Sequence, residues 1–119
     1  MRLVSATVIC CLISPLAWAA GNAVDGQKDF GRCSGCHAIK PGQNGIGPSL
    51  YSVAGRESGT AAGYPYSPAM VAAHLRWDDA SLNRFLANPQ SAVHGTKMFV
   101  AIPDEHLRQD IIASLDTLM

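Results

Sequence analysis

Hydrophobic residues recur at helical spacing near the C-terminal end of the chain. Leu107, Ile111, Leu115 and Leu118 follow one another at intervals of four, four and three residues. This spacing places the four side chains on one face of an α-helix. Asp104 stands just before the series, where an aspartate side chain can cap the first turn. The pattern therefore predicts a final helix with one apolar stripe that begins after Asp104.

Three further helices are predicted earlier in the chain. Residues 23–33 favour a helix in which Gly26 and Phe30 share one face. Ser67-Pro68 reads as an N-cap followed by proline at the first helical position, which opens a short helix to about His74. Asp78-Asp79 opens the next helix, which Asn88-Pro89 ends, and its apolar face comprises Leu82, Phe85 and Leu86.

Two long segments between these helices are predicted to be loops. Residues 39–65 are rich in glycine, proline, serine and asparagine, and residues 91–103 form the second loop. No segment alternates apolar and polar residues as a half-buried strand does, so we expect an all-α fold. Loops of this length inside a small domain are usually functional, and the first of them could wrap a ligand.

The first 19 residues have the pattern of a secretory signal peptide. A short basic start, Met1-Arg2, precedes a mostly apolar run over residues 3–16, and Ala17-Trp18-Ala19 resembles a signal-peptidase site. A buried helix or a membrane anchor is the alternative, but a membrane span needs about 20 apolar residues. We expect cleavage after Ala19, a single domain over residues 20–119, and an exported, periplasmic protein.

Charge and cysteine content narrow the function of this domain. Nine basic and nine acidic residues balance, and loss of Arg2 leaves eight against nine, with no basic cluster that would indicate nucleic-acid binding. No second apolar stretch predicts a membrane span after cleavage. Because Cys10 and Cys11 fall in the signal, about 100 residues remain with only Cys33 and Cys36. Such a domain has a limited core, and a bound group could fill it.

The two remaining cysteines belong to the sequence Cys33-Ser34-Gly35-Cys36-His37. Four kinds of chemistry use such a pair: a disulfide, a redox-active dithiol, half of a zinc site, or the attachment of a c-type haem. A structural zinc site needs four ligands, and the other histidines are scattered. A redox dithiol would follow a strand in a βαβ setting. A disulfide is compatible with export but leaves His37 and the glycine-rich loop without a role.

Haem attachment explains the spacing of all three residues. The thiols of Cys33 and Cys36 would each add to one vinyl group of a haem, and His37 would bind the iron from below the ring. The sequence therefore favours a protein with one covalently attached haem c, provided that the chain also supplies a sixth iron ligand and a loop around the haem.

Other segments of the chain resemble the class I cytochromes c, a family that includes mitochondrial cytochrome c and soluble bacterial proteins. Gly47-Pro48-Ser49-Leu50 is similar to the family's Gly-Pro-x-Leu, in which the proline carbonyl accepts the proximal histidine N–H. Residues 86–89 and Gly95-Thr96-Lys97-Met98 resemble its distal segment. The resemblance implies a small fold with crossing terminal helices, His37 and Met98 as iron ligands, and Pro48 as the histidine's partner.

By the same resemblance, Arg56, Tyr66 and Trp77 correspond to residues that donate hydrogen bonds to a haem propionate. Each also has an ordinary structural alternative, as a solvated charge, a turn residue and a core residue respectively. Three positions depart from the family's common residues: His94 where proline is usual, Phe85 in place of tyrosine, and Ser114 in place of an aromatic. These departures affect the iron–thioether bond and the helix pairing.

The resemblance implies a soluble one-electron carrier rather than an enzyme. His94, His74, Met70 and Lys97 compete with Met98 as sixth ligand, but only Met98 has the family's ligand position. With both axial positions filled, no site remains for substrate. We expect a monomer that serves redox protein partners of a respiratory chain: a dehydrogenase, a membrane cytochrome complex or an oxidase. The alternatives are a haem enzyme or gas-binding module with open iron, and a haem-free exported thiol protein.

Overall fold

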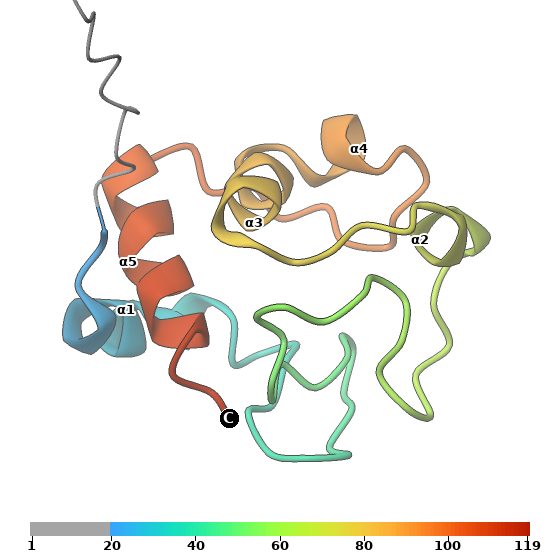
Figure 1. The fold of residues 1–119 in the computed structure, drawn as a ribbon, viewed down its shortest axis with the longest axis horizontal. Coiled ribbons are helices and arrows are strands. Elements are labelled where there is room, and N and C mark those ends of the chain that lie inside the picture. Colours follow the sequence, from blue (N-terminus) through green and yellow to red (C-terminus); the bar gives the residue numbers. More distant parts are fainter. Residues whose placement is uncertain (1–19) are drawn as a thin grey trace, which may run out of the picture.

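A computed structural model describes residues 20–119, so the predicted signal peptide lies outside the described residues. The elements in chain order are α1 (Ala23–Asp29), the 3₁₀ turn η1 (Phe30–Arg32), α2 (Pro68–Ala72), α3 (Asp79–Ala87), α4 (Pro89–Ala92) and α5 (Glu105–Leu115). Within residues 20–119 extended pairing is limited to an isolated bridge between Glu57 and Arg76. The prediction of an all-α fold with long loops is confirmed (Figure 1).

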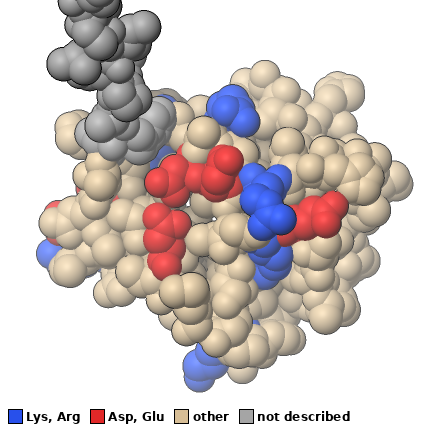
Figure 2. Space-filling view, viewed as in Figure 1, with Lys and Arg blue, Asp and Glu red and all other residues tan. Residues whose placement is uncertain are grey.

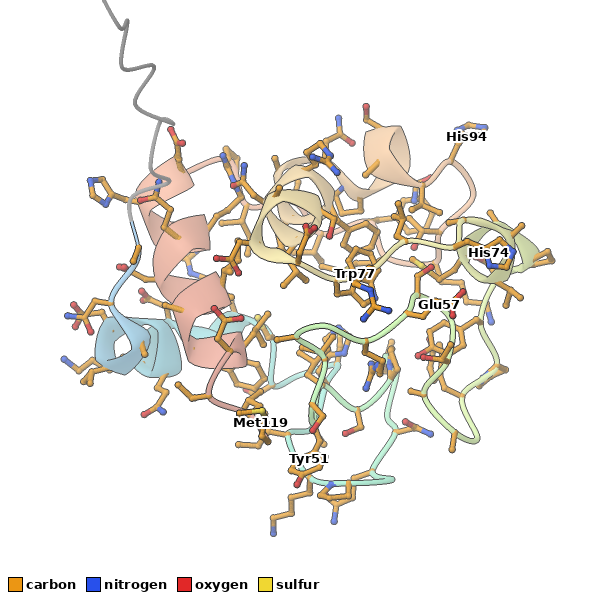
Figure 3. The ribbon with its side chains drawn as sticks, viewed as in Figure 1. Tyr51, Glu57, His74, Trp77, His94 and Met119 are labelled. Atoms are coloured by element: carbon orange, nitrogen blue, oxygen red, sulfur yellow. The ribbon has the colours of Figure 1, made fainter. Side chains whose placement is uncertain are left out.

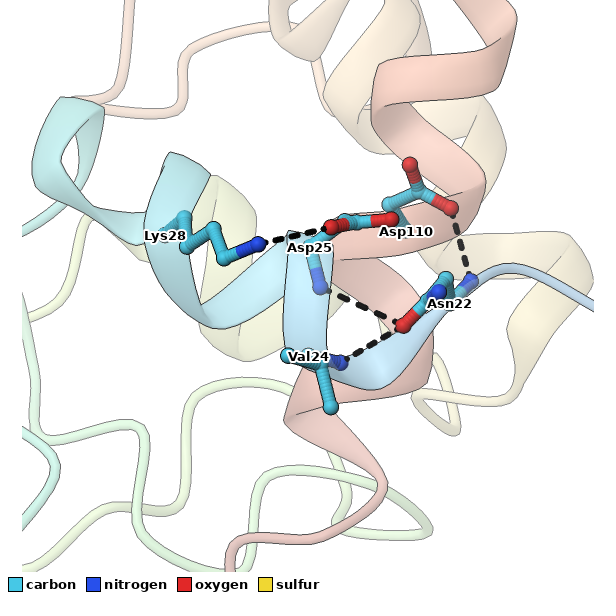
Figure 4. Close-up of polar contacts among 5 residues, drawn as sticks. All are labelled: Asn22, Val24, Asp25, Lys28 and Asp110. Carbon is cyan, nitrogen blue, oxygen red and sulfur yellow. Dashed lines mark hydrogen bonds and ion pairs between the residues drawn. The ribbon is translucent and has the colours of Figure 1, made fainter.

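The two terminal helices, α1 and α5, lie against each other (Figure 1). Gly26 is buried where they meet, and a Cβ added there would lie 1.8 Å from the carbonyl oxygen of Asp110. Only glycine allows this backbone approach. Figure 4 shows a second tie: the Asn22 N–H donates to the Asp110 carboxylate at 2.7 Å, while the Asn22 side chain caps α1. The N-terminal end of the described chain is therefore attached to the last helix.

Helix α5 begins as predicted but is shorter than its apolar stripe. The Asp104 carboxylate accepts the Leu107 N–H at 3.1 Å, and Ile111 and Leu115 are buried. The helix ends at Leu115, so the prediction that Leu118 continues it is wrong, although Leu118 still packs on the core. A turn after Leu115 keeps the apolar side chain on the same side without helical backbone.

Other helix boundaries also differ from the predicted ones. The α-helical backbone of the first segment ends at Asp29 and continues as η1 rather than as α-helix to Cys33. Asn88 ends α3 as predicted, but its side chain accepts the Ser91 N–H at 3.1 Å and caps α4. The predicted loop over residues 91–103 therefore starts inside a short helix.

Helix α3 forms the side of the core opposite the long loop. Asp78 and Ser81 make a reciprocal capping box, and the predicted apolar residues Leu82, Phe85 and Leu86 are all buried. In the loop over residues 39–65, Asn44 donates to the Ala62 carbonyl and accepts the Ser49 N–H, both at 2.9 Å. These bonds fold the loop back on itself, which leaves a cavity between it and the helices.

None of the helices within residues 20–119 combines the length and the apolar character that crossing a bilayer requires.

Candidate functional site

A cavity of about 450 Å³ lies between the helices and the long loop. Its lining is mainly apolar and contains three cations, Arg32, Arg56 and Lys97, but no carboxylate. The structure brings together in this lining all of the residues selected from the sequence: Cys33, Cys36, His37, Pro48, Arg56, Tyr66, Trp77 and Met98. Apart from the pentapeptide over residues 33–37, they lie at least eight positions apart in the sequence.

The Cys-Ser-Gly-Cys-His segment continues η1 as a further turn. The Cys36 and His37 N–H groups both donate to the Cys33 carbonyl, at 3.0 and 2.9 Å. This turn brings both thiols and the imidazole to the cavity, and no disulfide joins the two cysteines. Burial, and then the neighbouring Cys36, raise the pKa of the Cys33 thiol, while Arg32 lowers it. Cys33 is thus held as a thiol beside the cavity.

His37 is fixed in orientation by the backbone of the loop that follows it. Its Nδ1 lies 2.7 Å from the Pro48 carbonyl oxygen, so Nδ1 carries the proton and Nε2 keeps its lone pair. Burial lowers the pKa of His37, the bond to Pro48 opposes that shift, and the charge of Arg56 adds to it. The neutral imidazole that results is the form that binds a metal ion.

Gly47 lies face to face with the His37 ring. A Cβ at residue 47 would be 2.3 Å from the imidazole Cε1, far inside contact distance, and Gly47 is buried. The glycine is therefore required by the ring and not by an unusual backbone angle. In the sequence, Gly47 stands out only as part of the Gly-Pro-x-Leu motif, which does not predict this contact.

We expect Gly47→Ala to displace the His37 ring and to cost about 1–3 kcal/mol of stability, as overpacking of a filled site does. Gly35→Ala is the matched control, because nothing lies within 4 Å of a Cβ at Gly35. Denaturant unfolding of both holoproteins, followed by visible absorption, measures the difference. Equal stability of the two variants would contradict the proposed packing.

Arg56 has one hydrogen-bonding group left over. Its terminal nitrogens donate to the carbonyls of Tyr51 and Ser49, both at 3.1 Å, whereas its Nε is buried without a partner. A buried donor without an acceptor is costly. An anionic oxygen in the cavity would satisfy it, which fits the carboxylate-free lining.

Trp77 and Tyr66 line the cavity near the same loop. Trp77 is buried, its ring centroid is 5.1 Å from that of Phe85, and it lies among the central side chains in Figure 3. The Tyr66 hydroxyl accepts the Ala61 N–H at 3.0 Å, so its own proton remains available for donation. The lining therefore fits a flat, largely apolar group that carries acidic oxygens.

Met98 lines the cavity from the segment that follows α4. Met70 and Lys97 also belong to the lining, whereas His74 and His94 do not. Both histidines are exposed, and in Figure 3 His94 lies at the periphery of the molecule. Among the described residues, the side chains that compete with Met98 from within the cavity are thus Met70 and Lys97.

The segment around Met98 is held by contacts that no motif in the sequence predicts. The Gln90 amide donates to the Thr96 and Met98 carbonyls at 2.8 and 3.1 Å. Lys97 Nζ donates to the Pro65 carbonyl and lies 5.9 Å from the centre of the Tyr64 ring. A glutamine two residues after Asn88 gives no pattern in the sequence that would predict this role.

The fold and the cavity define a small all-α protein built around a flat prosthetic group. The sequence model of the cytochrome c family matches residues 23–111. The chain is 49% identical to a cytochrome c of Euglena viridis, in an alignment that covers 82% of this chain and 98% of the relative. It is 46% identical to cytochrome c2 of Rhodoblastus acidophilus, in an alignment that covers 81% of this chain and 92% of the relative. Cytochrome cH from Methylobacterium extorquens superimposes with a TM-score of 0.76 at 43% identity, covering 82% and 99%.

This chain belongs to the cytochrome c family. It is an electron-transfer protein and not an enzyme, and its cofactor is one covalently bound haem c. Cys33 and Cys36 are the cysteines of the attachment motif.

Proposed function

We propose that the protein is a soluble one-electron carrier in which His37 and Met98 are the axial ligands of a haem iron. The observation that supports this most directly is that a histidine with its Nδ1 bonded to Pro48, and the thioether of Met98, line the same cavity. A bound haem supplies the reversible one-electron change of its iron. With both of these side chains bound to the iron, no coordination position would be left for a substrate.

The other candidate site residues selected from the sequence also have roles in the proposed function. Cys33 and Cys36 would form the two thioethers, and the Pro48 carbonyl keeps the His37 proton on Nδ1. Arg56, Trp77 and Tyr66 would donate to the propionates, and the unpaired Arg56 Nε supports this assignment. A neutral thioether ligand stabilises Fe(II), and an apolar lining disfavours the extra charge of Fe(III). Both effects would raise the reduction potential of the haem.

The rim of the cavity favours a redox partner with an apolar surface. Ile46 and Phe99, both 77% exposed, belong to the lining together with Val100. On the face drawn in Figure 2, acidic and basic side chains lie next to each other, and uncharged atoms cover most of the surface. We infer that electrostatic steering is weak, since the charges nearly balance. A dehydrogenase, a membrane cytochrome complex or an oxidase is the class of partner proposed.

We also propose that the protein is exported to the periplasm after cleavage of residues 1–19, acts there in a respiratory chain, and is a monomer. The pattern of residues 1–19 supports export.

Purified protein tests the proposed function directly. The pyridine haemochrome spectrum should give one haem c per chain, and a potentiometric titration should follow a single one-electron curve. The ferric protein should show the weak sulfur-to-iron charge-transfer band at the red end of the visible spectrum. If the ferric protein instead has a high-spin spectrum and binds cyanide within the mixing time, the iron has an open coordination position. That result would refute His37 and Met98 as the two iron ligands.

A further inference from the structure

Gln90 makes the contacts that shape the segment carrying Met98. It is the second residue of α4, directly after the fully buried Pro89, and its side chain is half-buried. Its amide nitrogen donates to the Thr96 carbonyl at 2.8 Å and to the Met98 carbonyl at 3.1 Å. The amide group of Gln90 thus connects α4 to the backbone of Thr96 and of Met98 in the loop that follows.

These two bonds have no substitute within residues 20–119. Neither the Thr96 carbonyl nor the Met98 carbonyl accepts another hydrogen bond from the described residues. Two other bonds lie nearby: the Thr96 N–H donates to the Val93 carbonyl at 3.0 Å, and the Met98 N–H donates to the Thr96 hydroxyl at a long 3.4 Å. Of the two bonds made by the Met98 backbone itself, the one from Gln90 is the shorter, at 3.1 Å.

Lys97 restrains the same loop from the other side, but less directly. Its Nζ donates to the Pro65 carbonyl through a long and exposed side chain. A contact of this kind leaves the backbone free to move, because the lysine chain has several rotatable bonds. Gln90 acts on the carbonyl of Met98 itself, from a helix whose start is fixed by the Asn88 cap.

We propose that Gln90 is a positioning residue for Met98: its two hydrogen bonds keep the Met98 thioether on the iron and limit the opening of the axial site. This inference rests on the proposed ligation by Met98. In the ferric protein the thioether is the weaker axial ligand, so its dissociation controls the entry of an exogenous ligand. Loss of the amide donor increases the fraction of time that the loop is open.

Cyanide binding to the ferric holoprotein tests this role. Gln90→Ala removes the donor, and Gln90→Glu keeps the shape but replaces the donor with an acceptor. We expect cyanide to bind about tenfold faster to both variants, the effect of losing one to two net hydrogen bonds, and the red charge-transfer band to weaken. Ser91→Ala is the matched control, since Ser91 is the next residue of α4 and is exposed.

Repeating the measurement in the Met98→Ala variant distinguishes a specific effect of Gln90 on Met98 from a general loss of stability. In Met98→Ala, the axial site is already open, so adding Gln90→Ala should leave the cyanide rate unchanged. An equal acceleration in both backgrounds, or rates within twofold of wild type for both Gln90 variants, would overturn the inference while leaving Met98 as ligand. Wild-type protein without the red band would overturn the Met98 ligation and the inference together.

Discussion

Replacement of Met98 by alanine should open the haem iron on its distal side. The ferric protein is expected to lose the sulfur-to-iron charge-transfer band and to bind cyanide rapidly, and the ferrous protein to bind carbon monoxide rapidly. Because the ligand that favours Fe(II) is gone, the reduction potential should fall by on the order of 100 mV, within the range of about 0.8 V that axial ligands span. Visible spectroscopy and potentiometry measure both effects.

Two variants serve as controls for Met98→Ala. Met70 also lines the cavity and is buried, so Met70→Leu keeps its shape and should keep the band. His94, four residues earlier, reaches the iron only if the loop rearranges. Any low-spin form of Met98→Ala in which His94 has replaced the thioether should therefore vanish in Met98→Ala/His94→Ala. Loss of low-spin ligation in His94→Ala alone would identify a bis-histidine iron and contradict the assignment.

Removal of both attachment cysteines should abolish covalent haem. Cys33→Ala/Cys36→Ala is expected to give no haem-stained band after denaturing electrophoresis, whereas Cys36→Ala should retain at most one thioether. The haem-free chain should also be largely unfolded, because a domain of about 100 residues has a limited core and would keep an unfilled, mainly apolar cavity of about 450 Å³ in it. Far-ultraviolet circular dichroism measures the loss of helix.

A normal yield of covalent holoprotein from the double variant would refute attachment at these two thiols. Native helical content in the haem-free protein would instead show that the polypeptide folds without the haem. Gly35→Ala, within the same pentapeptide but with open space around the added methyl, is the matched control and should attach haem normally.

The sequence predicted the element types well because their signals are local. Asp104, Ser67 and Asp78 each cap a helix at the position expected from the residue type. The ends of helices were predicted less well. The apolar series ending in Leu118 continues past the end of α5, because a turn can present an apolar side chain to the core as a helix does.

The composition of the candidate site was also predictable, since its residues form a spaced motif. All eight selected side chains line one cavity, although their individual roles remain predictions. What the sequence did not predict are contacts between residues without a motif. The unpaired Arg56 Nε, the closeness of Gly47 to His37 and the amide of Gln90 between two carbonyls all depend on how distant segments meet.

The contact between the chain's two ends has a consequence for how fast the protein folds. The bond from Asn22 to Asp110 closes a loop of 88 positions, and ordering such a loop in a flexible chain costs about 4 kcal/mol of entropy. If His37 and Met98 bind one iron, as proposed, the polypeptide between them no longer adds to the loop, and about 27 positions remain to be closed, which lowers that cost by about 1 kcal/mol. Ligation of the iron would therefore shorten the loop that must close when α1 and α5 pair. This pairing should be several-fold faster once the iron has bound both ligands.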